Sequence, residues 1–193
     1  MTARIDQQLA FLVEADKLKS VLRATTLCDG SRRENSGEHS WHIALYALVM
    51  AEHSDSPVNV DRVIKMLLIH DLVEIDAGDT PIHGDHDPAE MAAVEQAAAD
   101  RLFGILPADQ TREFRALWEE FEAAETDDAV FAKSIDRVQP VISNLESGGG
   151  TWPQYNVTRD QLQTRVGVKV KRGAPAIWTA LRIRIDAWFA ENR

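Results

Sequence analysis

Apolar residues recur at steps of three and four positions along most of the chain, and no stretch alternates apolar and polar residues as a half-buried strand does. The pattern therefore predicts an all-α fold. It shows no internal repeat and no domain boundary, so residues 1–193 are expected to form a single domain. The predicted helices cover residues 5–22, 36–53, 63–75, 88–103, 107–121, 127–147, 159–166 and 175–191.

Short polar side chains, prolines and glycines mark several helix ends. Ser36 is the predicted N-cap of the second helix, because its hydroxyl can accept a hydrogen bond from a free amide of the first turn. Pro140 lies inside the long helix and is expected to kink it. Three glycines at 148–150 end that helix, and residues 152–172 are expected to be irregular apart from the short helix.

The stretch of residues 61–79 is apolar on almost every side, as a helix through the middle of a helical protein would be. His70, Asp71 and Glu74 interrupt it where burial is expected. A buried carboxylate without a partner is costly, so something must compensate these groups. A divalent metal ion would do so, because imidazole nitrogen and carboxylate oxygen are both good ligands for such ions. The alternative is a buried histidine satisfied by a nearby carboxylate, helped by Lys65 or a backbone carbonyl.

Composition narrows the classes of function. The formal net charge of −10 argues against binding of nucleic-acid polymers, which normally needs a basic face, but local charge still permits a small phosphorylated substrate. Cys28 is the only cysteine, so no intramolecular disulfide can form and a reducing compartment, the cytoplasm, is expected. The first residues lack the pattern of a signal peptide, and no apolar run approaches the length of a membrane span. No membrane partner is therefore expected.

Further potential metal ligands lie outside the central stretch. His39 and His42 both begin the core-facing stripe of the second helix, and spacing alone does not choose between them. His53 is explained by the preference of helix C-termini for cations. The loop after the central helix also concentrates ligand-type side chains, namely His83, Asp85 and His86.

A basic cluster stands out near the end of the first helix in this acidic protein. The lysines within it are explained by the same helix C-terminal preference. That explanation covers Arg23, Arg32 and Arg33 less well. These three arginines are therefore candidates for holding an anionic substrate.

Four short motifs occur in order: Glu38-His39-Ser40, His70-Asp71 with Glu74 one helical turn on, Gly78-Asp79, and Lys133-Ser134-Ile135-Asp136. This ordered set resembles the HD-domain metal-dependent phosphohydrolases, and within them the 5'-deoxynucleotidase-like branch. The resemblance extends over a motif core of about 12–152. It leaves residues 153–193 as a C-terminal loop and helix.

The resemblance implies one divalent metal ion and a set of four ligands. The implied ligands are His39, His70, Asp71 and Asp136. It favours His39 over His42, which then becomes a core residue or a support for the ligands.

The resemblance also implies roles for acidic and basic residues around the metal. Glu74 and Asp79 match non-ligand acids near the metal-bound water and the substrate. Arg23 and Arg32 resemble positions that hold the phosphate, and Arg33 beside them is a third candidate. The deoxynucleotidase branch also has a tryptophan next to an arginine in this region, and residues 23–32 contain none.

The implied activity is release of phosphate from (deoxy)nucleoside 5'-monophosphates. A divalent cation (Mn²⁺, Co²⁺, Mg²⁺ or Zn²⁺) lowers the pKa of bound water and supplies a hydroxide nucleophile, which Glu74 can orient or deprotonate. The metal and an arginine neutralise the phosphoryl oxygens. Asp79 either protonates the leaving alkoxide or holds a sugar hydroxyl.

Two other functions are compatible with parts of the pattern. One is a two-metal phosphodiesterase that uses His83, Asp85 or His86 as additional ligands. The other is a non-catalytic helical binding protein that is stabilised by its metal. Glu74 and Asp79 argue against the second, because a structural metal site does not require them.

The chain is also expected to form a homodimer. HD-domain phosphohydrolases of this branch commonly do so. In addition, Trp178 and Trp188 present more apolar surface than one small core readily covers.

Overall fold

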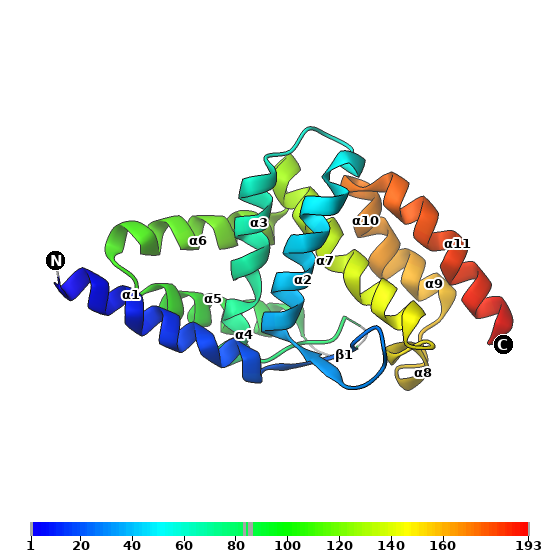
Figure 1. Cartoon of the computed structure of the whole chain (residues 1–193), viewed down its shortest axis with the longest axis horizontal. Coiled ribbons are helices and arrows are strands. Elements are labelled where there is room, and N and C mark those ends of the chain that lie inside the picture. Colours follow the sequence, from blue (N-terminus) through cyan, green and yellow to red (C-terminus); the bar gives the residue numbers. More distant parts are fainter. Residues whose placement is uncertain (1, 83, 85–86, 193) are drawn as a thin grey trace.

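A computed structural model describes residues 2–82, 84 and 87–192, and helices make up most of it (Figure 1). Within this described part the fold is all-α, with one small two-stranded sheet. None of the helices described has the length and apolar character that crossing a bilayer demands. In chain order the elements are α1 (Thr2–Ala15), a 3₁₀ turn (Asp16–Ser20), β1 (Leu22–Thr26), β2 (Arg33–Asn35), α2 (Ser36–Met50), a 3₁₀ turn (Ala51–His53), α3 (Val60–Ile69), a 3₁₀ turn (His70–Val73), α4 (Glu74–Ala77), α5 (Pro88–Phe103), α6 (Ala108–Ala123), α7 (Asp127–Glu146), α8 (Thr151–Gln154), α9 (Arg159–Gln161), a π-helical segment (Leu162–Gly167), α10 (Val168–Gly173) and α11 (Pro175–Glu191).

Helix α7 lies at the centre of the fold and carries a fully buried apolar stripe. Phe131, Ile135 and Val138 form this stripe. Helices α2, α3, α6, α10 and α11 all contact α7, and α2 crosses in front of it in Figure 1. The helix begins at Asp127 and contains Pro140, as predicted. Because neighbouring helices enclose α7, polar side chains on its α2-facing side are held in fixed positions.

The first helix is shorter than predicted, and a β-hairpin follows it. α1 ends at Ala15, and β1 pairs with β2 in antiparallel fashion. The register places Leu22 opposite Asn35 and Thr26 opposite Arg33. β1 has five residues and β2 three, and a pattern this short does not stand out from chance, so the hairpin was not predicted from the sequence.

Asn35 and not Ser36 is the N-cap of α2, so that prediction is wrong by one residue. The Asn35 side chain accepts a hydrogen bond from the Glu38 amide (2.9 Å), and the Glu38 carboxylate accepts one from the Asn35 amide (3.1 Å). This reciprocal pair is a capping box. Ser36 is buried and donates its hydroxyl to Glu74 instead.

The predicted central helix is divided at the His-Asp pair. α3 ends at Ile69, and residues 70–73 form a 3₁₀ turn before α4. A 3₁₀ turn has about three residues per turn, so neighbouring side chains point about 120° apart rather than about 100°. His70 and Asp71 are both buried at this junction, and Nε2 of His70 lies 2.8 Å from Oδ1 of Asp71.

Residues 151–173 are more helical than predicted, because α8, α9, the π-helical segment and α10 occupy most of them. Trp178 packs on this region and is 2% exposed, and Trp188 is partly buried. The two tryptophans therefore belong to the core of a single chain. The apolar argument for a homodimer that rested on them is wrong.

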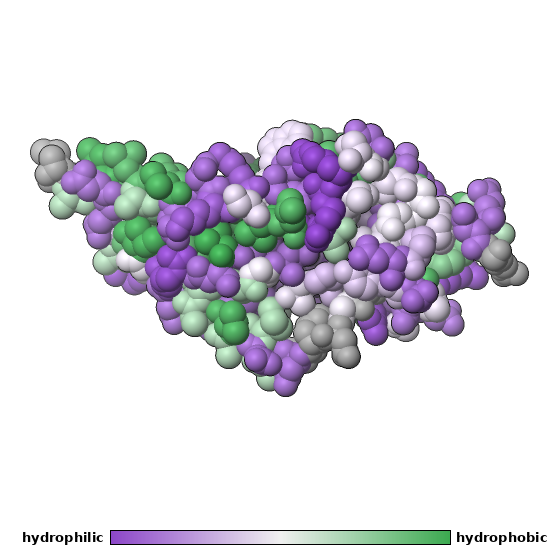
Figure 2. All heavy atoms as spheres, turned by 90° about the horizontal axis from the view of Figure 1, so that it is seen from below, coloured by the Kyte–Doolittle hydropathy of each residue, from purple (hydrophilic) through white to green (hydrophobic). Residues whose placement is uncertain are grey.

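Exposed apolar side chains are concentrated instead on the outer faces of α1 and α2. In Figure 2, hydrophobic residues gather on the half of the face that includes α1, while the opposite half is more hydrophilic. The exposed apolar residues of these two helices are Ile5, Leu9, Leu12, Val13, Trp41, Leu45, Leu48 and Val49.

Gly167→Ala is expected to lower stability by about 1–3 kcal/mol, the usual cost of overpacking a core. A Cβ at Gly167 would lie 2.3 Å from Cζ2 of Trp178, a buried ring that has no room to shift. Chemical denaturation measures the change, with Thr164→Ala, an exposed position in the same segment, as the control. A midpoint equal to wild type for both variants would contradict this packing.

Candidate metal centre and phosphate site

Three side chains from distant parts of the chain converge on one point. His39 lies on α2, His70 on the 3₁₀ turn and Asp136 on α7, and one donor atom from each lies within 4.8 Å of the others. Asp136 Oδ1 is 3.0 Å from His39 Nε2 and 3.7 Å from His70 Nε2. Because α2 and α3 both pack on α7, and the 3₁₀ turn follows α3 directly, the fold itself brings these groups together.

The fourth predicted ligand, Asp71, lies at the edge of this group. Its Oδ1 is 2.8 Å from His70 Nε2, and its Oδ2 accepts a hydrogen bond from Arg23 Nη1 at 2.9 Å. One oxygen of Asp71 therefore faces the two histidines, while the other faces the arginine.

The donor set fits a divalent metal ion. His70 Nε2 is buried and makes no hydrogen bond to any described residue, since the nearby Asp71 oxygen is not aligned with it. An unsatisfied buried nitrogen that points at two carboxylates is costly unless a cation lies between them. Imidazole nitrogens and carboxylate oxygens are ligands suited to Zn²⁺, Mn²⁺ or a similar ion.

Each histidine is oriented by a second hydrogen bond on its other nitrogen. His39 Nδ1 lies 3.0 Å from Gln139 Oε1, and His70 Nδ1 lies 2.9 Å from the Leu67 carbonyl. Both acceptors favour a proton on Nδ1. The Nε2 lone pairs then face the convergence point, which is the arrangement that metal-binding histidines usually have.

Burial and charge shift the pKa values of these groups in opposite directions. Burial alone would lower the pKa of His70, but the Asp71 charge and the contact with Asp136 outweigh it and raise the pKa to about 10. Burial acts to raise the pKa of Asp136, but its contacts with His39 and His70 hold it well below the usual range. Cationic and anionic groups thus balance one another, and a divalent cation in place of the protons would preserve that balance.

Arg23 lies beside this centre on β1 and is the one of the three predicted arginines that the structure brings to it. Its Nη1 is 3.5 Å from Asp79 Oδ1 and 3.7 Å from Glu74 Oε1, in addition to the bond with Asp71. Burial would lower the pKa of Arg23, but these carboxylates raise it. The guanidinium therefore remains charged inside the protein.

Glu74 and Asp79 both line the same cavity as Arg23. Burial, reinforced by the Asp71 charge, raises the pKa of Glu74 to about 8. Burial also raises the pKa of Asp79, whose Oδ2 accepts a hydrogen bond from the Ala24 amide at 3.2 Å. Carboxyl groups with raised pKa values are suited to moving a proton near neutral pH.

Arg32 and Arg33 lie outside the cavity, so the structure does not place them where the sequence suggested. Arg32 is exposed and forms a bidentate pair with Glu38 (2.7 and 2.9 Å). Arg33 is also exposed and donates to the backbone carbonyls of Leu22 and Arg23. The hairpin explains the difference, because β1 turns Arg23 inward while the loop and β2 leave the other two arginines at the surface.

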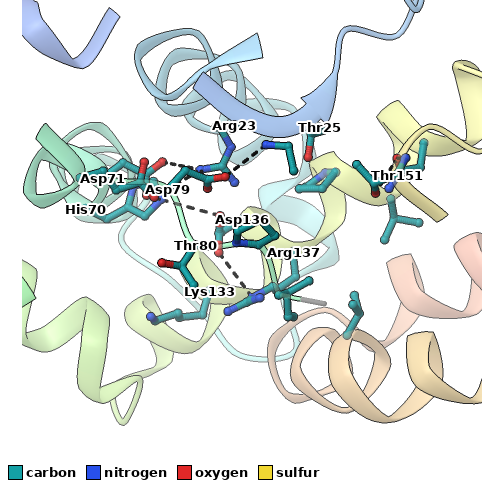
Figure 3. Close-up of a pocket in the computed structure, with 18 of the residues that line it drawn as sticks. Arg23, Thr25, His70, Asp71, Asp79, Thr80, Lys133, Asp136, Arg137 and Thr151 are labelled. Carbon is teal, nitrogen blue, oxygen red and sulfur yellow. Dashed lines mark hydrogen bonds and ion pairs between the residues drawn. The ribbon is translucent and has the colours of Figure 1, made fainter. Parts of the chain in front are cut away.

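The cavity beside the metal centre measures about 230 Å³. Figure 3 shows Arg23, Asp71 and Asp79 on one side of it and Lys133 and Arg137 on another, with Asp136 between them. Arg137 Nε lies 3.6 Å from Asp136 Oδ2. Away from the metal centre the wall is formed by Thr25, Pro140, Val141, Asn144, Thr151, Trp152, Tyr155, Leu162 and Val166.

Several residues of the site were missed by the sequence analysis. Lys133 and Arg137 stand one helical turn apart and flank Asp136, which was a usable signal. Ser36 was assigned to a cap, and Gln139 was hidden among the apolar residues of α7. Glu34 carried no signal, because it lies in the three-residue strand β2, which is too short to show a periodic pattern.

Two further histidines that the structure describes are not part of the group of three. His42 is half-buried, with its Nδ1 3.4 Å from Gln139 Nε2, and His53 lies in the 3₁₀ turn that follows α2. His83, Asp85 and His86, proposed as ligands of a second metal, lie outside the described residues.

Comparison with known proteins gives a consistent result. A family model described as HD domain matches residues 15–178. A 5'-deoxynucleotidase HDDC2 from Homo sapiens is 29% identical over 139 residues, which are 72% of this chain and 67% of the relative. A 5'-deoxynucleotidase yfbR from Photorhabdus temperata is 26% identical over 167 residues, covering 82% and 84%.

Two solved structures are similar in fold. The crystal structure of a predicted metal-dependent phosphohydrolase from Magnetospirillum magnetotacticum MS-1 superimposes with a TM-score of 0.92 at 47% identity, over 98% of this chain and 97% of that one. A conserved hypothetical protein from Pyrococcus furiosus has a TM-score of 0.63 at 21% identity, covering 90% and 98%, and shows the fold alone.

Proposed function

Because the chain belongs to the HD-domain family and is a metal-dependent phosphohydrolase, we propose that it releases phosphate from nucleoside 5'-monophosphates, including deoxynucleotides. The observation that carries this proposal is the buried Arg23, whose guanidinium lies 2.9 Å from Asp71 within the same cavity as the metal centre. A guanidinium and a cation side by side form a site for a phosphoryl group. The names of the relatives support a nucleotide as its carrier.

His39, His70, Asp71 and Asp136 would hold one divalent ion. Such an ion would supply a water of lowered pKa and would neutralise charge on the phosphoryl oxygens. Asp71 would lie between the ion and Arg23, and Arg23 binds the phosphate on the side of Asp71 that faces away from the ion.

Glu74 orients the attacking water and accepts its proton, and Ser36 fixes the Glu74 carboxylate by donating to Oε2. Asp79, held by the Ala24 amide, either protonates the leaving oxygen or binds a sugar hydroxyl. Lys133 and Arg137 add two positive charges to the wall of the cavity and attract the anionic oxygens of the substrate. The aromatic wall formed by Trp152 and Tyr155 then receives the base.

We further propose a cytoplasmic homodimer. The single cysteine supports a reducing compartment. The exposed apolar faces of α1 and α2 are the surface that a second copy would cover.

Arg23→Ala is expected to raise KM for the phosphate ester at least tenfold, because it removes a charge-assisted contact worth about 1.5–3 kcal/mol. Arg32→Ala is expected to leave KM unchanged, since Arg32 pairs with Glu38 at the surface. Steady-state kinetics of both variants on one substrate tests the assignment. The reverse pattern would restore Arg32 as the phosphate ligand.

A phosphate-release screen tests the proposed function itself. Ribo- and deoxynucleoside 5'-monophosphates, 3'-monophosphates and bis(p-nitrophenyl) phosphate are compared with Mn²⁺, Co²⁺, Mg²⁺ and Zn²⁺, and bound metal per chain is counted. We expect release from 5'-monophosphates with one metal per chain. Hydrolysis of the diester alone with two metals would instead establish the phosphodiesterase alternative.

A further inference from the structure

Glu34 is a nearly fully buried carboxylate, 2% exposed, that lies between two functional side chains. Its Oε1 is 3.4 Å from Arg23 Nε and 3.5 Å from His39 Nδ1. β2 carries it, directly across the hairpin from Arg23. One carboxylate thus contacts both the arginine assigned to phosphate and the imidazole assigned to metal.

Gln139 closes a second connection between Glu34 and the metal centre. Its Nε2 donates to Glu34 Oε2 at 3.0 Å, and its Oε1 lies 3.0 Å from His39 Nδ1. The amide also donates to Ser143 Oγ at 3.2 Å, which prevents it from rotating freely. The orientation of the His39 ring is therefore set by an amide that Glu34 itself holds in place.

The need to neutralise the charge of Arg23 does not explain why a carboxylate is buried at position 34. Asp71, Asp79 and Glu74 already lie within 3.7 Å of Arg23, all at Nη1. A fourth buried carboxylate adds a desolvation cost without being needed for neutrality. Glu34 Oε1 instead lies near Nε of Arg23, where neither atom makes a hydrogen bond to a described residue, so the two opposite charges attract each other from a second direction.

We propose that Glu34 is a positioning residue that holds the Arg23 guanidinium and, through Gln139, the His39 imidazole in one fixed arrangement. The proposal rests on the proposed roles of Arg23 and His39. It requires that Glu34 influence two affinities, one for the metal and one for phosphate. Gln139 contacts His39 and Glu34 but not Arg23, so its loss is expected to weaken metal binding more than phosphate binding.

The experiment measures Mn²⁺ affinity, and inorganic phosphate affinity at saturating Mn²⁺, by titration calorimetry. Glu34→Gln is expected to weaken Mn²⁺ binding by about 10- to 100-fold and phosphate binding by at least about tenfold. Gln139→Met is expected to weaken Mn²⁺ binding more than phosphate binding, because Gln139 contacts His39 directly and Arg23 only through Glu34. Glu52→Gln, the same chemical change at an exposed carboxylate in the 3₁₀ turn after α2, is the matched control and should alter neither affinity.

Glu34→Asp separates position from charge, because it keeps the carboxylate but shortens its reach. It is expected to lose both affinities as Glu34→Gln does. Thermal unfolding of each variant shows whether the protein remains folded at the titration temperature. Wild-type affinities in Glu34→Asp, or an effect of Glu34→Gln on one affinity only, would overturn the proposal.

These titrations need no turnover, so they stand apart from the proposed function. If no nucleotide released phosphate while Glu34→Gln weakened both affinities, the proposed substrate would be wrong and the role of Glu34 would hold. If nucleotides were hydrolysed and Glu34→Gln bound Mn²⁺ and phosphate as wild type does, the proposed function would hold and the proposed role of Glu34 would be wrong.

Discussion

Replacing Glu74 with glutamine is expected to lower turnover on the order of 10²- to 10⁴-fold, the range for loss of a general acid–base group. Glutamine keeps the shape and can still accept the hydrogen bond from Ser36, but it cannot take a proton from water. Metal content should not change, because Glu74 is not among the converging ligands. Turnover and metal content of both proteins, measured side by side on the best substrate, test the assignment.

The same substitution has a predictable effect on stability. Burial raises the pKa of Glu74 to about 8, above its ordinary value of 4.5. A carboxyl whose pKa is raised by folding stabilises the fold least when ionised, so metal-free wild type loses stability as pH rises from about 4.5 through 8. Metal-free Glu74→Gln should lose less stability than wild type over this pH range in thermal unfolding scans, and the raised pKa values of His70 and Asp79 account for the loss that remains.

Glu119→Gln, an exposed change on α6, is the control for both measurements. Equal turnover in wild type and Glu74→Gln, with metal retained, would show that another group takes the proton.

Replacing Asp136 with asparagine is expected to abolish metal binding at micromolar concentrations and, with it, nearly all turnover. Asp136 Oδ1 lies between the two imidazoles, 3.0 Å from His39 Nε2 and 3.7 Å from His70 Nε2. The neutral amide removes the charge that attracts a cation and leaves two buried imidazoles without their anionic partner. The expected readout is less than one tenth of wild-type metal after dialysis.

Thermal unfolding gives an independent measurement of the Asp136 change. Metal that binds the folded state stabilises wild type by mass action, so its Tm should rise with added Mn²⁺. The Tm of Asp136→Asn should not respond, whereas Asp160→Asn, an exposed change at α9, should respond as wild type does. A Tm of Asp136→Asn that rises with Mn²⁺ would remove Asp136 from the ligand set.

The helices that bury a regular apolar stripe were predictable from the sequence. α7 begins at the predicted residue and α11 at the predicted proline, because periodic burial and capping residues act locally. The β-hairpin was not predictable, since strands of three and five residues with few apolar side chains carry no periodic signal. The same limit hid the cap at Asn35.

The residues of the site likewise fall into those that could be predicted from the sequence and those that could not. The sequence indicated His70, Asp71 and Glu74, because charged groups inside an apolar helix need an explanation, and the resemblance supplied His39 and Asp136. Neither the sequence nor the resemblance could show that Arg23 rather than Arg32 is the phosphate candidate, because this depends on which way a short strand turns its side chains.

Glu34 and Gln139 are a second case of the same limit. The two residues are 105 positions apart in the sequence, and their role depends on the hydrogen bond between them. Such contacts exist only after the tertiary fold has formed.

The order of these groups along the chain affects when the site can exist during synthesis. His39 and Asp136 are separated by 97 residues and meet only where α7 packs against α2. A nascent chain that has emerged as far as α6 holds Arg23, His39 and the His-Asp pair, but lacks both Asp136 and the helix that encloses them. The complete set of ligands for the metal therefore forms only after α7 has packed against α2. Before that point the nascent chain holds the other ligands without Asp136.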